Sequence, residues 1–388
     1  MKALIAGCAA LLVSGAAFAA DPDVSDAEIK VGDVNIMSGP AAFVGKGFAL
    51  GSKIAAAEIN ASGGIRGRKL VVITEDDGYV PSRSFQALTK LIENDHIFAL
   101  NGTSGTANVM AMMPLITENN LPTMVTEAPA SLVYKPVRPS VFTFGANYSD
   151  AFYAQLKYIH DHKLAKEGAW GIFRQDDDFG KEVEQGFDRA VKEFGAKTAT
   201  PVRFKKGTSN FSAEMAQMKQ AGVSVIANGG IFAGAANILA EARKLDMDIQ
   251  SAGVWSEGIP ASAALSAPAG YNFMVADYVS LVGPANDRFK EMAKKYVSEA
   301  ELANISRYTY ASYIGLTSLA HAMSLCGQDL TRACTIEKLR GLKDFDTGGL
   351  SAPISFDNPR QLAGSDVAVY QFDVNAKAFK ALTEFQKY

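Results

Sequence analysis

Apolar and polar positions form two kinds of pattern along this chain. Short apolar runs such as Ile29–Ile36 and Leu70–Glu75 have the length and composition of buried strands. Longer amphipathic runs such as Gly45–Asn60 and Pro81–Asn94 have helical periodicity. The alternation continues with a strand-like run at 97–100, a helical run at 107–119 and a strand-like run at 122–125. This pattern is typical of βαβ units and predicts a parallel sheet covered on both faces.

The alternation of strand-like and helical runs begins again after about residue 148 and predicts a second lobe of the same kind. Predicted helices at 149–163, 180–194, 211–221 and 233–245 alternate with strands at 169–173, 200–204, 223–227 and 249–254. A strand at 273–277 would lead back to the first lobe and its helices at 287–298 and 308–326, and a strand at 367–373 would return to the second lobe. No linker rich in Pro or Ser separates the halves. We predict an α/β fold of two doubly wound, Rossmann-like lobes, formed by residues 28–148 with 277–352 and by residues 149–276 with 353–388.

The length and charge of the chain agree with this division. A chain of 388 residues exceeds one ordinary core and favours two domains. The net charge is −3, and no cluster of Lys and Arg is present. A nucleic-acid partner is therefore not expected, because phosphate binding needs a basic surface.

The first twenty residues have the features of a cleaved signal peptide. Lys2 precedes an apolar run at 3–18, and Ala17-Phe18-Ala19 matches the small-residue cleavage pattern. We expect residues 1–20 to be removed on export to the periplasm. Removal takes Cys8 and leaves Cys326 and Cys334, an even pair in an exported chain. The pair predicts a disulfide that closes a short loop between two helices, and two free thiols are the alternative.

Motifs of catalysis, cofactor binding and metal binding are not found in the sequence. The glycines at 45, 47 and 51 are one residue too far apart for a dinucleotide loop, and no Lys-Ser or Lys-Thr follows a glycine loop. Gly102-Thr103-Ser104-Gly105 lacks the spacing of a nucleophile elbow. His160 and His162 would point to nearly opposite sides of a helix. Asp176-Asp177-Asp178 lacks the spacing of a calcium loop. We expect a protein that is not an enzyme and has no cofactor or metal.

Ligands of open α/β sheets bind beyond the carboxyl ends of the strands, and several loops there are small and polar. The loop at 101–106 brings Ser104, Gly105 and Thr106 to the start of a helix, where an anion is favoured. The loop at 126–131 offers backbone groups and a serine hydroxyl, and the loop at 38–43 offers an aromatic wall. The second lobe contributes loops at 176–180, 229–232 and 254–257, with aromatic residues and one carboxylate.

Three segments resemble a known family. They are Ser38-Gly39-Pro40, the run Glu58-Ile59-Asn60-Ala61-Ser62-Gly63-Gly64-Ile65-Arg66-Gly67, and Glu75-Asp76-Asp77. Together they resemble the leucine/isoleucine/valine-binding family of periplasmic solute receptors for ABC importers. The resemblance spans essentially all of the chain after the signal and includes the Asp178-Phe179-Gly180 loop and the closely spaced cysteines. It implies two lobes joined by three crossovers, which close on a small solute and deliver it to a membrane permease.

The resemblance also implies roles for residues. Ser104 to Thr106 would hold a carboxylate, backbone groups near Ala128 and Ala130 would add contacts, and Glu257 would hold an ammonium group. The family's threonine in the second loop is replaced by Ala130, with Ser131 as its expected substitute, and Ile231 and Phe232 alter the usual aromatic cap. The complete set of candidate ligand-binding residues is Phe43, Ser104, Gly105, Thr106, Ala128, Ala130, Ser131, Tyr148, Asp150, Phe179, Ile231, Phe232, Trp255 and Glu257.

The sequence therefore predicts a monomeric receptor for a hydrophobic or branched-chain amino acid or a similar small carboxylate. A receptor for an aromatic carboxylate without an amine is the alternative, since Ala130, Phe43, Phe179, Phe232 and Trp255 depart from a simple aliphatic site. A neutral solute, a sensory ectodomain and an enzyme are more remote alternatives.

Overall fold

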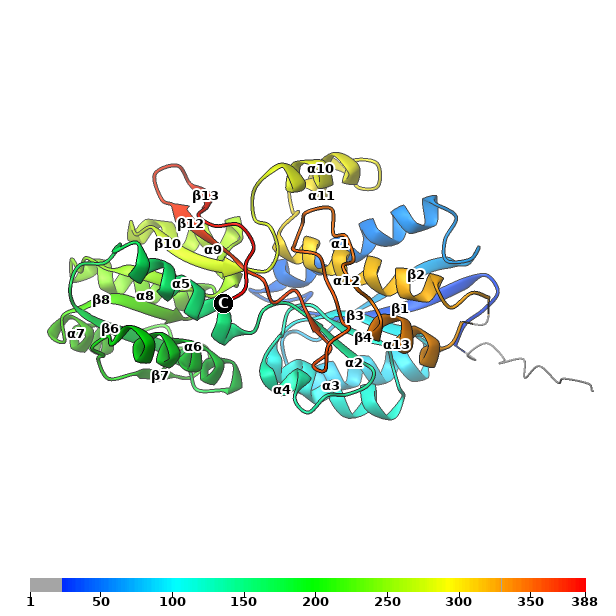
Figure 1. The fold of residues 1–388 in the computed structure, drawn as a ribbon, viewed down its shortest axis with the longest axis horizontal. Helices are drawn as coiled ribbons and strands as arrows, with labels where there is room; N and C mark the ends of the chain where they lie inside the picture. The colour runs from blue at the N-terminus through cyan, green and yellow to red at the C-terminus, as the bar shows by residue number, and fades with distance from the viewer. Residues whose placement is uncertain (1–22, 329) are drawn as a thin grey trace, which may run out of the picture.

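The computed structural model describes residues 23–328 and 330–388, which form two lobes that each surround their own sheet (Figure 1). The predicted signal peptide at 1–20 lies outside the described residues. Over the described part of the chain, no helix is both long enough and apolar enough to cross a bilayer.

Lobe 1 contains a six-stranded sheet in the order β11-β5-β4-β3-β1-β2. Every neighbouring pair in it is parallel. The strands are β1 (Glu28–Asn35), β2 (Lys69–Asp76), β3 (Ala99–Thr103), β4 (Thr123–Val125), β5 (Val141–Phe144) and β11 (Leu362–Ala363). Since parallel strands end at one edge of the sheet, the segments that follow β1, β3 and β4 meet there.

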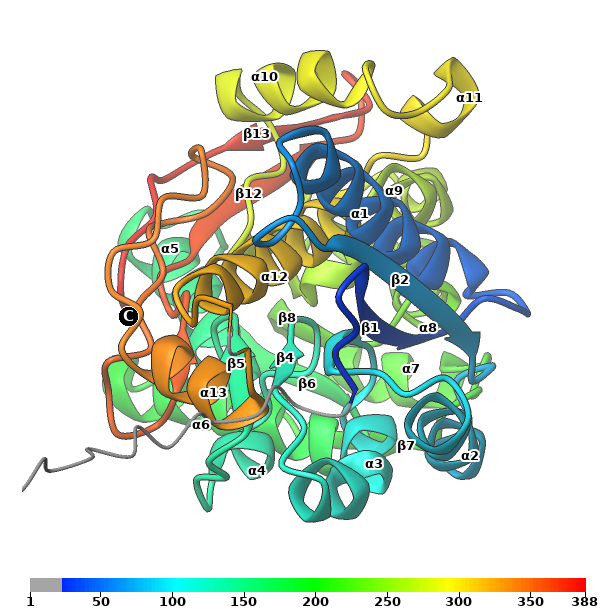
Figure 2. The same ribbon diagram turned by 90° about the vertical axis from the view of Figure 1, so that its right-hand side faces the viewer.

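Helices cover both faces of the lobe 1 sheet (Figure 2). The pair α1 (Ala42–Ala61) and α12 (Arg307–Ser324) covers one face, and the pair α2 (Pro81–Glu93) and α3 (Thr106–Glu118) covers the other. Small residues allow α1 and α12 to pack closely, because a Cβ atom at Gly51 would lie 2.3 Å from the Thr309 carbonyl oxygen. The lobe also contains α4 (Ser131–Tyr134), α10 (Pro284–Ala293), α11 (Glu299–Leu302) and α13 (Arg332–Arg340).

Lobe 2 contains a seven-stranded sheet in the order β13-β12-β10-β9-β8-β6-β7, in which β12 is antiparallel to both of its neighbours. The strands are β6 (Ala169–Gln175), β7 (Val202–Phe204), β8 (Val223–Gly229), β9 (Gln250–Gly253), β10 (Phe273–Asp277), β12 (Ala368–Asp373) and β13 (Ala378–Ala381). Its helices are α5 (Tyr148–Asp161), α6 (Asp178–Phe194), α7 (Ser212–Gln220), α8 (Ala233–Lys244) and α9 (Pro260–Ser266), with short 3-10 turns at Trp255–Glu257 and Ala267–Ala269.

Three crossovers join the lobes, at residues 145–147, 278–283 and 364–367. The two-lobed α/β fold predicted from the sequence is thus confirmed. The last crossover lies later than expected, because residues 353–363 remain with lobe 1. The β11 strand pairs with β5, and the ring of Phe356 packs against that of Phe142 at 5.2 Å.

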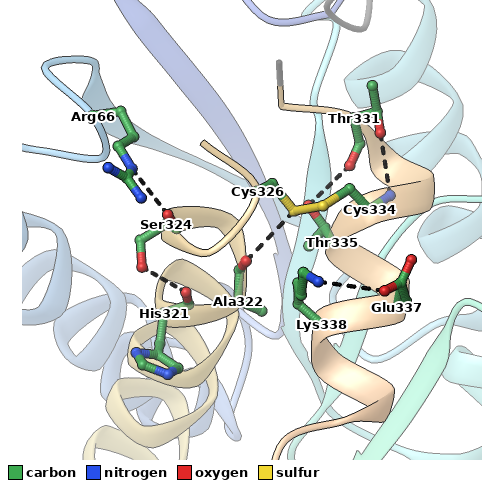
Figure 3. Close-up of a disulfide and its surroundings, with 10 residues drawn as sticks. All are labelled: Arg66, His321, Ala322, Ser324, Cys326, Thr331, Cys334, Thr335, Glu337 and Lys338. Atoms are coloured by element: carbon green, nitrogen blue, oxygen red, sulfur yellow. Dashed lines mark hydrogen bonds and ion pairs between the residues drawn. A yellow bond between two sulfur atoms is a disulfide. The ribbon is translucent and has the colours of Figure 1, made fainter. Parts of the chain in front are cut away.

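A disulfide joins Cys326, after α12, to Cys334 in α13, with a Cα–Cα distance of 5.9 Å (Figure 3). The Thr331 hydroxyl accepts a hydrogen bond from the Cys334 backbone N–H at 3.1 Å and caps α13. The bridge therefore fastens the two helices at the end of lobe 1 that lies beside the described N-terminus (Figure 1).

Candidate functional site

A cleft lies between the lobes, where the carboxyl ends of the two sheets face each other. The cavity inside it has a volume of about 50 Å³. Each lobe contributes loops that follow its central strands, as the sequence predicts for an open α/β sheet. The residues that line it are Ile36, Val44, Tyr79, Ser104, Gly105, Thr106, Glu127, Tyr148, Phe179, Ile231, Phe232, Val254, Trp255, Ser256 and Tyr308.

The start of helix α3 gives the cleft a site for an anion. Gly105 precedes the helix with φ of 85°, and a Cβ atom there would lie 2.4 Å from the Tyr79 ring, so glycine is required. No side chain caps the helix, and its first turn contains no acidic residue. Free backbone N–H groups and the helix dipole therefore favour a negative group at this point.

Three buried hydroxyl groups in the cleft have no hydrogen-bond partner within the described residues. Ser104 and Thr106 belong to lobe 1, and Ser256 follows β9 in lobe 2. A buried polar group without a partner is costly. Such groups also occur elsewhere in the described residues, so the position of these three in the cleft wall, and not the missing partner alone, marks them as candidates. The three hydroxyls are thus available to a bound solute from both sides of the cleft.

Aromatic rings form much of the cleft wall. The rings of Tyr148 and Trp255 stack at 4.4 Å with an angle of 14°, and Phe179 meets Tyr148 edge-on at 4.7 Å. Phe232 packs edge-on against Phe43 of the opposite lobe at 5.0 Å. Phe43 was expected to be a wall of the site, but it supports Phe232 and does not line the cleft. The wall is suited to a solute with an apolar body.

Glu127 is the carboxylate among the lining residues, and it lies in a buried charge network. Its Oε1 atom accepts a hydrogen bond from Trp255 Nε1 at 2.9 Å. Its Oε2 atom lies 3.1 Å from the Tyr278 hydroxyl, which also donates to the Thr126 carbonyl oxygen at 2.6 Å. Oε2 also pairs with Arg307, whose guanidinium binds Asp277 as well. Burial raises the pKa of Glu127, and the charge of Arg307 acts against this shift. One arginine and two carboxyl side chains thus meet beside the cleft, and of the three only Glu127 lines it.

Glu257 lies behind the cleft, not in its lining. Its Oε1 atom accepts a hydrogen bond from the Phe232 backbone N–H at 3.0 Å, and its Oε2 atom accepts one from the Ser266 hydroxyl at 3.2 Å. The residue is 2 % exposed, and burial raises its pKa to about 8. The expected ammonium partner is therefore turned away from the cleft, toward its own lobe.

Four other candidates also lie outside the lining. Ala128 and Ala130 are buried. The Ser131 backbone N–H donates to Glu182 Oε1 at 3.0 Å, and its hydroxyl makes a further hydrogen bond to the same atom. Asp150 forms an ion pair with Arg189 at 3.1 Å. The structure brings together in the cleft the remaining candidates, which are Ser104, Gly105, Thr106, Tyr148, Phe179, Ile231, Phe232 and Trp255.

Seven lining residues were not among the candidates, namely Ile36, Val44, Tyr79, Glu127, Val254, Ser256 and Tyr308. Glu127 and Ser256 lie inside loops that the sequence marks as binding loops, so they could have been chosen. Tyr79 and Tyr308 gave no local signal, because they reach the cleft only through the packing of distant segments. In the ranges 23–328 and 330–388, no group of His, Cys, Asp and Glu side chains is arranged to hold a metal ion.

The fold and the cleft define a two-lobed solute-binding protein. The periplasmic binding protein family matches residues 28–378, and the chain belongs to this family. A Leu/Ile/Val-binding protein of Citrobacter freundii is 27% identical over 387 residues, with 98% of each chain covered.

Solved structures show the same fold. A branched-chain amino acid ABC transporter protein from Thermus thermophilus with bound valine has a TM-score of 0.80, with 20% identity over 94% of this chain and 98% of that one. A solute-binding protein from R. palustris in complex with 4-hydroxybenzoate has a TM-score of 0.78, with 20% identity over 93% of this chain and 97% of that one.

Proposed function

We propose that this protein is a periplasmic receptor that captures a hydrophobic amino acid or a similar small carboxylate and delivers it to the permease of an ABC importer. The observation that carries the proposal is the set of unpartnered hydroxyls at the uncapped start of α3, inside an aromatic cleft between two lobes. A carboxylate would accept hydrogen bonds from Ser104 and Thr106, and the apolar body would contact the rings. The Leu/Ile/Val-binding relative supports the amino-acid class.

Binding would couple to closure of the lobes. Lobe 1 groups at the start of α3 would capture the carboxylate first, and closure would add Ser256, Trp255 and Phe232 from lobe 2. A solute that contacts both lobes stabilises the closed form relative to the open form. The closed form would then dock on the permease.

The same proposal includes export by a cleaved signal at residues 1–20 and a monomeric state. It also includes the absence of catalysis and of a cofactor.

The second candidate solute is an aromatic carboxylate without an amine. It is favoured by the number of rings around the cleft, among them Tyr148, Phe179 and Trp255. The related fold from R. palustris in complex with 4-hydroxybenzoate supports this possibility.

A thermal-shift titration of the protein after signal removal tests the proposal. One half of the panel holds L-leucine, L-isoleucine, L-valine and L-phenylalanine, and the other holds benzoate, 4-hydroxybenzoate and aliphatic acids without an amine. A solute at a hundred times its Kd should stabilise the fold by about 2.7 kcal/mol, which raises the Tm by several degrees. A response to amino acids supports the first candidate, and a response only to amine-free acids supports the second. If neither half of the panel raises the Tm, the proposal is contradicted.

A further inference from the structure

Tyr79 forms part of the cleft wall and belongs to the loop that leads from β2 to α2. Its ring lies against Gly105, where an added Cβ atom would be 2.4 Å from a ring carbon. Because Gly105 directly precedes α3, the ring covers the uncapped start of that helix. Tyr79 is thus placed to cover a carboxylate that binds at the start of α3.

The loop that contains Tyr79 is fastened to lobe 1 by a buried acid. Tyr79 has φ of 63°, in the left-handed region that residues with a side chain rarely adopt. Its backbone N–H donates to Asp77 Oδ1 at 2.8 Å. Asp77 is buried, and its Oδ2 atom accepts hydrogen bonds from the Ser84 hydroxyl at 2.7 Å and from Asn108 Nδ2 at 2.9 Å. Since a rare backbone conformation persists only where its surroundings hold it, these bonds to α2 and α3 fix the position of Tyr79.

A lysine of lobe 2 contacts the same tyrosine from across the cleft. Lys206 follows β7, and its ammonium group lies 3.2 Å from the centroid of the Tyr79 ring. The Lys206 Nζ atom also donates to the Tyr79 carbonyl oxygen at 3.5 Å. Burial lowers the pKa of Lys206, and the charges of Asp177 and Asp77 act against this shift. One cation of lobe 2 thus contacts both the ring and the backbone of a cleft residue in lobe 1.

The topology of the two sheets places this contact far from the crossovers. The strand before Tyr79 is β2, at one edge of the lobe 1 sheet, and the strand before Lys206 is β7, at one edge of the lobe 2 sheet. The crossovers connect to β5 and β11 in lobe 1 and to β10 and β12 in lobe 2, toward the opposite side of each sheet. Rotation about the crossovers therefore moves the β2 and β7 edges apart by the largest distance. The contact between Lys206 and Tyr79 can form only when the lobes are closed.

We propose that Tyr79 is a further solute-binding residue, which covers the carboxylate, and that Lys206 is a positioning residue that clasps Tyr79 when the lobes close. The covering role rests on the proposed function, whereas the clasp is a property of the protein itself. The clasp forms after lobe 1 has captured the solute. It should therefore slow the release of the solute and have little effect on its capture.

The experiment measures capture and release separately, by stopped-flow mixing with L-leucine and with 4-hydroxybenzoate. Lys206→Met keeps an apolar side chain over the ring but removes the cation, and it should raise the rate constant of release, koff, by about two- to thirty-fold. The rate constant of capture, kon, should stay within about two-fold of the wild type. Lys206→Arg keeps a cation and should remain close to the wild type. Lys205→Met is the matched control, because it removes an exposed charge from the same loop.

A double-mutant cycle tests whether Lys206 acts through Tyr79. Tyr79→Leu alone should lower the affinity for both probes by about five-fold or more, because the ring is lost. In the Tyr79→Leu background, Lys206→Met should change koff much less than in the wild type, since no ring is left to clasp. Additive effects of the two substitutions would overturn the clasp, and an unchanged affinity in Tyr79→Leu would overturn the covering role. Thermal melting identifies unfolded variants, and Tyr79→Met replaces a Tyr79→Leu protein that does not fold.

NMR of the Lys206 side chain observes the clasp directly. The methylene protons next to the ammonium group should be shifted upfield by the ring current of Tyr79, and this shift should disappear in Tyr79→Leu. Saturating solute should enlarge the shift, because it favours the closed form. A Lys206 signal at the same position as that of Lys205, with and without solute, would overturn the clasp. If the wild type binds neither probe, the covering role fails together with the proposed function, and an upfield shift in the solute-free protein would still support the clasp.

Discussion

At the scale of single residues, the cleft combines buried hydroxyls without partners and a carboxylate that is paired with a buried arginine. Ser104, Thr106 and Ser256 lose hydration on folding and gain no protein hydrogen bond in return. The position of Ser104 and Thr106 beside the start of α3 gives this cost a functional explanation, since a bound carboxylate would supply the missing acceptor. Ser256 faces the same cleft from lobe 2.

Removal of these hydroxyls should weaken binding without harm to the fold. We expect Ser104→Ala and Thr106→Ala each to lower solute affinity by about five- to a hundred-fold, because each loses a hydrogen bond to a charged group. Titration calorimetry measures the affinity, and thermal melting measures stability. Ser251→Ala is the control, since that buried hydroxyl also lacks a partner but does not line the cleft. An equal loss of affinity in the control would contradict a role for the cleft hydroxyls.

The buried Glu257 carboxyl should make the stability of the protein depend on pH. Its pKa is about 8 in the folded protein and 4.5 in the reference state. Between these values the folded protein holds a proton that the unfolded chain has lost, so stability falls as pH rises. We expect the free energy of unfolding of Glu257→Gln, relative to the wild type, to rise by up to about 1.4 kcal/mol per pH unit in this window. Urea titrations at pH 5.5, 6.5 and 7.5 measure the free energy of unfolding of both proteins. A difference between them that does not change with pH would contradict the raised pKa of Glu257.

Single residues could be predicted where the signal is local. Ser104, Gly105 and Thr106 follow a strand and start a helix, so their place in an open α/β sheet follows from the sequence. The network of Glu127 could not be predicted in this way, because its partner Arg307 is 180 positions away in the chain. Glu257 was assigned by resemblance, and the hydrogen bond that turns it toward Phe232 depends on the shape of the backbone.

At the scale of elements, periodicity predicts the long helices and buried strands well and the short elements poorly. The expected helix at 81–94 is α2 (Pro81–Glu93), and the expected strand at 273–277 is β10. The two-residue strand β11 was missed, since two residues have no periodicity. It is held in lobe 1 by pairing with β5 and by Gln361, whose side chain donates to the Val141 carbonyl at 2.8 Å.

The disulfide between α12 and α13 should stabilise lobe 1. Cys326 and Cys334 are 8 residues apart, and closure of so short a loop is worth about 2–3 kcal/mol in the chain-entropy account. We expect the double variant Cys326→Ser with Cys334→Ser to lose about this much in the free energy of unfolding, with solute affinity nearly unchanged. Urea unfolding measures the loss of stability, and calorimetry measures the solute affinity. Equal stability of the two proteins, or two free thiols in the wild type by mass spectrometry, would contradict the bridge.

At the scale of the whole molecule, the lobes are joined by the three crossovers and also by side chains that meet across the cleft. Trp255 of lobe 2 donates to Glu127 of lobe 1, and Lys206 of lobe 2 lies over the Tyr79 ring of lobe 1 at 3.2 Å. These contacts lie at the cleft itself. Motion about the crossovers would break them, so they contribute to the balance between the open and closed forms.

The contact between Ser131 and Glu182 offers a direct test of that balance. Glu182 lies on α6 in lobe 2, and its Oε1 atom accepts hydrogen bonds from both the backbone N–H and the hydroxyl of Ser131 in lobe 1. Separation of the lobes would remove both bonds, so they stabilise the closed form alone. Charge-assisted bonds contribute about 1.5–3 kcal/mol each at most, enough to change the closed population by ten-fold or more.

Glu182→Ala should therefore enlarge the radius of gyration of the solute-free protein in small-angle X-ray scattering and lower solute affinity by about ten-fold. Saturating solute should restore the wild-type radius, because contacts through Trp255 and Phe232 remain. Glu184→Ala is the matched control, since that glutamate lies on the same helix and pairs with Arg174 and Arg203 within lobe 2. A variant at position 182 that keeps the wild-type radius and affinity would mean that solute contacts, and not this bond between the lobes, decide closure.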